Sequence, residues 1–320
     1  MAGGEEKNTG GKMATRAAFG ATIAELGEKF PEIVVLDADL AGSTKTGEFA
    51  KKFPDRAINV GIAEQDLVAT AAGLAVAGKK PFACGFAVFV TGRAYDQIRS
   101  SVAISEMPIV IVGSHAGILT GEDGATHQSL EDIGLMRALP GVTILSPADA
   151  VETRAAVEFA ARAKNPVYLR LGRAGVPIIF SEKETFDFSQ IRVLNQIQNP
   201  KIVVFATGPL VASALIAAKK LEKEFSVRVV NVSNLSEIDE KGVLDAISDA
   251  EKIFTAEDHS VKNGLGSAIA EICAENAVGK KLFRHGMRRF GESGTTADLY
   301  EKYKFDPDGV AECLRKVAGK

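Results

Sequence analysis

Short apolar runs rich in β-branched residues alternate with segments of helical length along most of the 320-residue chain. The run IVVL at 33–36, for example, follows a segment with apolar residues at helical spacing. Strands that alternate with helices form a mainly parallel sheet covered on both faces, so the pattern predicts an α/β fold. The expected elements of the first half are strands at 33–36, 57–60, 81–86, 108–113, 142–146 and 166–171, and helices at 15–29, 64–77, 95–105 and 147–163.

The alternation stops between about residues 176 and 199, where the composition becomes mixed polar and aromatic. It then resumes with expected strands at 201–206, 226–232 and 252–256 and helices at 212–225, 241–248 and 266–274. Hydrophobic residues make up 46% of the chain, which is enough for two separate cores. We therefore predict two α/β domains with mainly parallel sheets at 13–180 and 199–320, a linker at 181–198 and a flexible tail at 1–12.

Charge and cysteine content exclude several classes of protein. The 38 Lys+Arg and 41 Asp+Glu give a net charge of −3, which provides neither a basic field for nucleic acid nor a polybasic membrane patch. Three widely separated cysteines do not make a disulfide scaffold or a zinc-binding pair. The chain contains no apolar run long enough to span a bilayer, and its first residues lack the apolar centre of a signal peptide. We expect a cytoplasmic protein with no nucleic-acid or membrane partner.

The loops after the expected strands are the segments in which we expect a ligand site, because parallel α/β sheets bind ligands beyond the carboxyl ends of their strands. Glu64, in the segment NVGIAEQ, begins a helix directly after a strand. A carboxylate there either complements the helix dipole, which is worth a few tenths to about 1 kcal/mol, or belongs to a site. Asp39 and Ser43, in DADLAGS, are equally open to two interpretations: a turn with helix capping, or a site.

Two further segments combine unusual residue types. Phe86 and Phe89 lie three apart where a helix is expected to begin, so they share a face that either packs in the core or forms an aromatic wall for a flat heterocycle. The loop 114–128 holds His115 and His127, two of the four histidines, with acids and glycines between them. The spacing of the two histidines is not that of a zinc site. Their imidazoles suit proton transfer or contacts with sugar hydroxyls and phosphate.

Several of these segments together resemble the carboxyl-terminal half of transketolase, an enzyme that uses thiamine diphosphate. They are DADLAGS, NVGIAEQ, CGFAVF and SHAGILTGEDGATHQ, of which GEDGATHQ is the most specific. The similarity is dense from about residue 13 to 175 and continues more loosely in TAEDHSVKNGLGSAIAE and RRFGESGTTADLYEKY. The resemblance implies a thiamine-diphosphate-binding fold, with a pyrimidine-binding domain followed by the transketolase C-terminal domain. It also implies transfer of a two-carbon ketol group between ketose and aldose phosphates.

The resemblance also implies roles for single residues. Glu64 corresponds to the glutamate that hydrogen-bonds N1′ of the cofactor's aminopyrimidine and favours the tautomer able to take a proton. Phe86 and Phe89 correspond to the aromatic residues beside the pyrimidine, and Asp39 to an aspartate near the thiazolium. The substrate-binding set implied in the same way is Arg16, Ser43, His115, Asp123, His127 and Arg173. Glu64, His115 and His127 are the implied catalytic residues.

One part of the family's pattern is missing. Full-length transketolases begin with a domain that binds the diphosphate through magnesium and carries a GDG signature, and no GDG occurs in this chain. The resemblance therefore implies a split transketolase, with thiamine diphosphate bound between this chain and an N-terminal transketolase subunit in an α2β2 assembly. The magnesium ion is expected on the partner subunit, and we assign no metal ligand to this chain.

Three alternatives remain open at this stage. The same two domains occur in the beta subunits of 2-oxo acid dehydrogenases, which lack the GEDGATHQ loop, and in enzymes resembling deoxyxylulose-phosphate synthase. The chain could also be a non-catalytic partner subunit that keeps the fold without the chemistry. His259, in the segment EDHS, receives no role.

Overall fold

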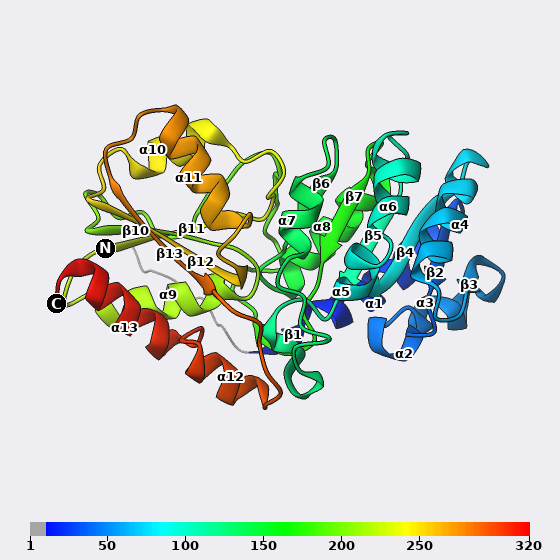
Figure 1. Ribbon diagram of the computed structural model, residues 1–320, viewed down its shortest axis with the longest axis horizontal. Coiled ribbons are helices and arrows are strands. Elements are labelled where there is room, and N and C mark those ends of the chain that lie inside the picture. The colour runs from blue at the N-terminus through cyan, green and yellow to red at the C-terminus, as the bar shows by residue number, and fades with distance from the viewer. Residues whose placement is uncertain (1–10) are drawn as a thin grey trace.

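The computed structural model describes residues 11–320 and consists of two α/β lobes that lie side by side (Figure 1). The first lobe is built on a six-stranded sheet in which every neighbouring pair is parallel. Its strands, in the order in which they pair, are β3 (Ala57–Asn59), β2 (Ile33–Asp37), β4 (Lys80–Phe86), β5 (Val110–Ser114), β7 (Val167–Arg170) and β6 (Thr143–Leu145).

Helices cover both faces of this sheet, because its strands are apolar on both sides. In β2, Ile33 and Val35 join one apolar cluster, whereas Val34 and Leu36 join another, as the twofold alternation of a strand requires. The elements around the sheet are α1 (Thr15–Lys29), α2 (Ala41–Thr44), α3 (Gly47–Lys52), η1 (Pro54–Arg56), α4 (Glu64–Val76), α5 (Ala87–Gly92), α6 (Tyr95–Gln97), η2 (Ile98–Ala103), η3 (Ile118–Asp123), α7 (Asp132–Arg137) and α8 (Ala150–Arg162).

The second lobe contains a five-stranded sheet with helices on two sides. Figure 1 shows α10 and α11 above the strands and α9 and α13 below them. In pairing order the strands are β13 (Lys281–Met287), β12 (Lys252–Ser260), β10 (Ile202–Ala206), β11 (Val227–Asn231) and the antiparallel edge strand β9 (Arg192–Val193). The helices are α9 (Leu210–Leu221), α10 (Glu240–Ile247), α11 (Leu265–Glu275), α12 (Thr296–Lys302) and α13 (Pro307–Ala318). The predicted α/β class with mainly parallel sheets is confirmed.

The two lobes are joined by more than the chain between them. The Leu235 N–H donates to the Ile144 carbonyl (2.9 Å) and the Ser146 N–H to the Ser233 carbonyl (2.8 Å), so the edge at β6 continues into the second lobe. The buried Glu152 of α8 accepts a hydrogen bond from the Asn231 side chain (2.8 Å). These polar contacts fix the lobes relative to one another.

The structure departs from the predicted boundaries in two places. The predicted linker at 181–198 contains β9, which pairs with β11 and thus belongs to the second sheet. The predicted tail at 1–12 falls outside the described residues as far as residue 10. Its last residue, Lys12, begins β1 (Lys12–Ala14), which pairs with β8 (Gly175–Pro177). A short strand pair of this kind carries no apolar alternation, so the sequence pattern does not reveal it.

The helix predictions differ from the structure at some positions and agree with it at others. The helix at 15–29 is confirmed as α1. The helix at 95–105 is instead α6 followed by a π-helical turn, η2. The carboxyl-terminal α13 was not predicted, although Asp306 caps it by accepting the N–H groups of Asp308 and Gly309, and Pro307 stands at its first position.

Candidate functional site

The predicted site residues gather at the carboxyl edge of the first sheet, as expected for parallel strands. The loops after five of the six strands contribute most of them, and the loop after β6 contributes none. Asp39 and Ser43 follow β2, and Glu64 begins α4 after β3. Phe86 ends β4, and Phe89 lies in the following α5. The remaining site residues are His115, Asp123 and His127 after β5, Arg173 after β7, and Arg16 in the first turn of α1.

Glu64 is a buried carboxylate that forms an ion pair with Arg93. It is the first residue of α4 and only 1% exposed. The Arg93 guanidinium donates from Nη1 to Glu64 Oε2 at 2.6 Å and lies 4.8 Å from the centre of the Phe89 ring. In the described part of the chain no hydrogen bond reaches Glu64 Oε1. A carboxylate that only complemented a helix dipole would lie in solvent, so its burial distinguishes Glu64 from an ordinary helix-start acid.

Sequence reasoning missed Arg93. A signal was nevertheless available, because Arg93 follows Phe89 by four residues, and residues so spaced share a face of a helix.

Two phenylalanines and two histidines form one aromatic cluster. The rings of Phe86 and Phe89 are 6.0 Å apart and nearly parallel. The His115 ring stacks on Phe86 with 3.8 Å between centres. The His127 ring meets Phe89 edge-on at 5.2 Å. The structure therefore brings the two predicted aromatic residues and both histidines of the loop 114–128 together, in a wall that suits a flat ring.

His115 is held as a neutral imidazole. It is 2% exposed, its backbone has φ = +57°, and its Nδ1 lies 2.9 Å from the Ser114 hydroxyl. Burial, together with the positive charges of Arg16 and Arg173, lowers the pKa of His115 to about 3. The imidazole can therefore form hydrogen bonds at neutral pH but brings no positive charge to a phosphate. Left-handed backbone at a residue other than glycine is rare and concentrates at functional sites.

Two arginines converge beside His115. Arg16 donates from Nε to the Arg173 carbonyl (3.1 Å) and from Nη1 to the Ser43 carbonyl (2.7 Å). Arg173 Nη1 lies 3.4 Å from the Asp123 carboxylate. Burial and the neighbouring Arg173 lower the pKa of Arg16. Two neighbouring guanidinium groups of this kind suit a phosphate. Ser43 takes part by accepting the hydrogen bond from Arg16 at its backbone carbonyl.

Asp39 lies apart from this cluster. Its side chain is exposed, its φ is +63°, and its Oδ1 accepts from Asn59 Nδ2 at 3.2 Å. Within residues 11–320, no hydrogen bond or ion pair joins it to another predicted site residue. The loop is anchored instead by the buried Asp37, which accepts from the hydroxyls of Thr44 (2.8 Å) and Thr46 (3.0 Å). Burial raises the pKa of Asp37.

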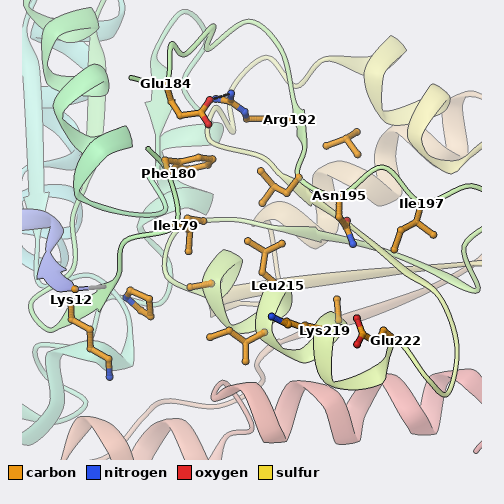
Figure 2. Close-up of a pocket in the computed structure, with 17 residues that line it drawn as sticks. Lys12, Ile179, Phe180, Glu184, Arg192, Asn195, Ile197, Leu215, Lys219 and Glu222 are labelled. Carbon is orange, nitrogen blue, oxygen red and sulfur yellow. Dashed lines mark hydrogen bonds and ion pairs between the residues drawn. The ribbon is translucent and has the colours of Figure 1, made fainter. Parts of the chain in front are cut away.

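Other features of the described chain lie outside this site. Among residues 11–320 no group of three or more His, Cys, Asp or Glu side chains is arranged to hold a metal ion. None of the helices in that range is both long and apolar enough to cross a membrane. A hollow of about 1000 Å³ lies against α9, with Phe180, Leu215 and Lys219 on its walls (Figure 2). It contains none of the predicted site residues.

Comparison with known families assigns both lobes. Residues 11–178 match the family described as "Transketolase, pyrimidine binding domain", and residues 190–310 match "Transketolase, C-terminal domain". The chain belongs to the transketolase family. The resemblance inferred from DADLAGS, NVGIAEQ and GEDGATHQ is thereby confirmed.

Individual relatives of this transketolase-family chain differ in length. A protein of Methanocaldococcus jannaschii, provisionally named a transketolase C-terminal section, is 40% identical over 310 residues, which are 96% of both chains. Human transketolase is 36% identical over 97% of this chain, which corresponds to 50% of the human protein. A solved structure described as "Split gene transketolase, inactive beta4 tetramer" superposes with a TM-score of 0.86 at 42% identity, covering 97% of this chain and 99% of the other. The chain therefore spans half of a full-length transketolase and the whole of these shorter relatives.

Proposed function

We propose that this chain is the carboxyl-terminal subunit of a split transketolase. In this role it transfers a two-carbon ketol group from a ketose phosphate to an aldose phosphate. The observation that carries the proposal is the arrangement at one sheet edge. There, a buried Glu64 and the Phe86–Phe89 wall stand next to the neutral His115 and the Arg16–Arg173 pair. The residues proposed to bind the cofactor and those proposed to bind the sugar phosphate thus lie in one site.

Thiamine diphosphate fits the residues present. Glu64 offers a buried carboxylate with Oε2 on Arg93 and Oε1 open, and aromatic rings lie close by, as a flat heterocycle with a ring nitrogen at its edge requires. When bound, the cofactor would supply the carbanion chemistry that breaks and forms the carbon–carbon bond. Glu64 would hold a proton at the pyrimidine N1′, and Phe86 and Phe89 would orient the ring. Asp39 is proposed to lie near the thiazolium.

The remaining residues act on the sugar phosphate. Arg16 and Arg173 would bind the phosphate, with Ser43 keeping Arg16 in place through its carbonyl. Asp123 would accept a hydrogen bond from a substrate hydroxyl. His115, which is neutral, would hydrogen-bond the phosphate end of the substrate. His127 would hydrogen-bond the substrate oxygen atoms near the reacting carbonyl and move protons there.

The other half of the cofactor site is proposed to come from a second chain. This chain matches only 50% of the length of human transketolase, and its sequence lacks the GDG signature. We propose an N-terminal transketolase subunit as partner, holding magnesium and the diphosphate, in an α2β2 assembly in the cytoplasm. The inactive form named for the solved split transketolase supports the idea that such a chain needs its partner.

Reconstitution tests this proposal. The purified chain, a candidate N-terminal transketolase subunit, thiamine diphosphate and Mg²⁺ are combined, and ketol transfer from a ketose phosphate is followed. We expect turnover only when both chains are present, and loss of turnover in the Glu64→Ala complex. Full activity of this chain alone would refute the split arrangement. Decarboxylation of a 2-oxo acid, or condensation of pyruvate with a triose phosphate, would instead identify one of the alternative enzymes, and no activity of either kind would favour a non-catalytic subunit.

A further inference from the structure

The substrate loop, residues 115–128, has an irregular backbone. His115, Gly117, Gly121 and Gly124 all have positive φ, so the loop interrupts regular pairing at four points. The short 3₁₀ turn η3 is the only helical element in it, and it is broken at Gly121. Backbone N–H groups in such a segment need partners from elsewhere in the fold.

Asp258, in β12 of the second lobe, provides those partners. Its carboxylate accepts the Ile118 N–H at Oδ1 (2.9 Å) and the Leu119 N–H at Oδ2 (3.4 Å), although 140 residues separate Asp258 from Ile118. The Tyr300 hydroxyl donates to Oδ2 at 3.1 Å. Asp258 is 2% exposed. It therefore caps the first turn of η3, as an N-cap residue would, but from another domain.

Gly117 makes this contact possible. A Cβ atom at this position would lie 2.3 Å from Asp258 Oδ2 and 2.6 Å from Oδ1. With φ at +74°, the residue also needs a backbone conformation that glycine adopts without strain. Asp258 and Gly117 are thus fitted to each other across the domain boundary.

The backbone of Asp258 is held by one member of a buried ion pair, Arg170–Asp132. Arg170 donates from Nη2 to the Asp258 carbonyl (2.8 Å) and from Nε to Asp132 Oδ2 (2.7 Å). All three residues are buried. His259, the next residue in β12, belongs to the same buried group: its Nε2 lies 4.0 Å from Asp132 Oδ1, and its Nδ1 lies 2.7 Å from the Ser260 carbonyl. The loop is therefore held by a carboxylate that cannot readily change its own position.

We propose that Asp258 is a positioning residue, through which the second domain sets the geometry of the substrate loop and hence its affinity for the phosphorylated sugar. This proposal rests on the proposed transketolase function. Two hydrogen bonds connect η3 to residues of the proposed substrate site. The Thr120 hydroxyl donates to the His115 carbonyl (2.6 Å), and Arg173 donates to the Thr120 carbonyl. A shift of η3 therefore moves His115 and Arg173 together.

A matched control lies one residue away. Glu257 is buried and accepts the N–H groups of Leu265 (2.8 Å) and Gly266 (2.9 Å), so it caps α11 as Asp258 caps η3, but inside its own domain. The variants Asp258→Asn and Glu257→Gln each replace a buried carboxylate that accepts two successive amides. Only the first change touches the substrate loop.

Hydrogen exchange in the full chain and kinetics of the reconstituted complex test the proposal. In Asp258→Asn, we expect exchange in a peptide covering 115–121 to accelerate about tenfold, and KM for the phosphorylated acceptor to rise about tenfold, because a hydrogen bond to a charged group is lost. Affinity for thiamine diphosphate should not change, and KM for an unphosphorylated acceptor should rise less, because that acceptor lacks the phosphate that Arg173 is proposed to bind. Glu257→Gln should accelerate exchange at 262–268 and leave both KM values unchanged.

Two results would overturn the proposal: wild-type exchange of the loop in Asp258→Asn, or an equal rise of KM in Glu257→Gln. Absence of ketol transfer in the wild-type complex would refute the proposed function instead. The exchange data for the loop would still decide whether Asp258 holds it, since they require no turnover.

Discussion

Replacing Arg93 by alanine removes the one cationic partner that a buried carboxylate has among residues 11–320. Glu64 is 1% exposed, whereas the Arg93 side chain is 49% exposed. Breaking a fully buried pair costs about 3–5 kcal/mol, and an exposed pair contributes about 0–1 kcal/mol. Because only one partner of this pair is buried, we expect Arg93→Ala to lower the free energy of unfolding by about 2 kcal/mol.

Equilibrium urea unfolding of the isolated chain measures this loss, with Glu64→Gln and the double variant completing a mutant cycle. Glutamine keeps the shape of Glu64 without its charge, so the double variant should lose less than the sum of the single changes, with a coupling of about 1–2 kcal/mol. Arg162→Ala is the control. Arg162 is exposed and lies 5.1 Å from the Phe30 ring, and no ion pair to it is seen in the described chain. Its loss reports the aromatic contact alone, about 0.5–1 kcal/mol.

Additivity would refute this reasoning. If the effects of Arg93→Ala and Glu64→Gln add to within about 0.5 kcal/mol, the two side chains do not interact in solution. Glu64 would then be compensated in some other way, and the geometry around Oε2 would not describe the unliganded chain.

The remaining predictions concern pH and packing. Burial raises the pKa of Glu152 from 4.5 to about 7, so the folded state binds the proton more tightly than the unfolded state does. The free energy of unfolding therefore falls as pH rises from 4.5 to 7. Glu152→Gln should remove about 3 kcal/mol of this pH dependence, measured by urea unfolding at a series of pH values. His115 contributes a pH dependence of the opposite sign, because its pKa in the folded protein, about 3, lies below the ordinary value of 6.5. The free energy of unfolding therefore falls as pH falls below 6.5. His115→Asn should reduce this loss between pH 7 and pH 5 by about 2 kcal/mol. Gly113→Ala would place a Cβ 2.3 Å from the buried Tyr168 hydroxyl, and thermal unfolding should show a loss of about 2 kcal/mol or more; an unchanged melting temperature would contradict the packing described.

Local patterns were sufficient for most of the fold. The helix at 15–29 and the strand IVVL were predictable because their apolar residues repeat with the period of a helix and of a buried strand. The predicted linker at 181–198 was misjudged at β9, because a two-residue edge strand has too few residues to show a period. Helix α13 was missed although its Asp-Pro start is a recognised signal.

The candidate site was predictable in part. The rule that loops at the carboxyl edge of a parallel sheet carry the site singled out Glu64, Phe86 and His115. The family motifs suggested their roles and added Arg173. Arg93 and Asp258 were not found. Both act through partners distant in sequence, 29 residues away for Arg93 and 140 for Asp258.

By itself the sequence determined the α/β class, the two domains and the edge of the sheet where the candidate site residues gather, because these follow from periodicities and turns that are local in the chain. Only the tertiary structure decided that Glu64 is buried against Arg93, that His115 is neutral, and that a carboxylate of the second domain holds the substrate loop. The physical reason is that burial and charge neighbours arise where distant segments meet. A pKa or a buried hydrogen bond depends on that meeting and not on any residue's neighbours in sequence.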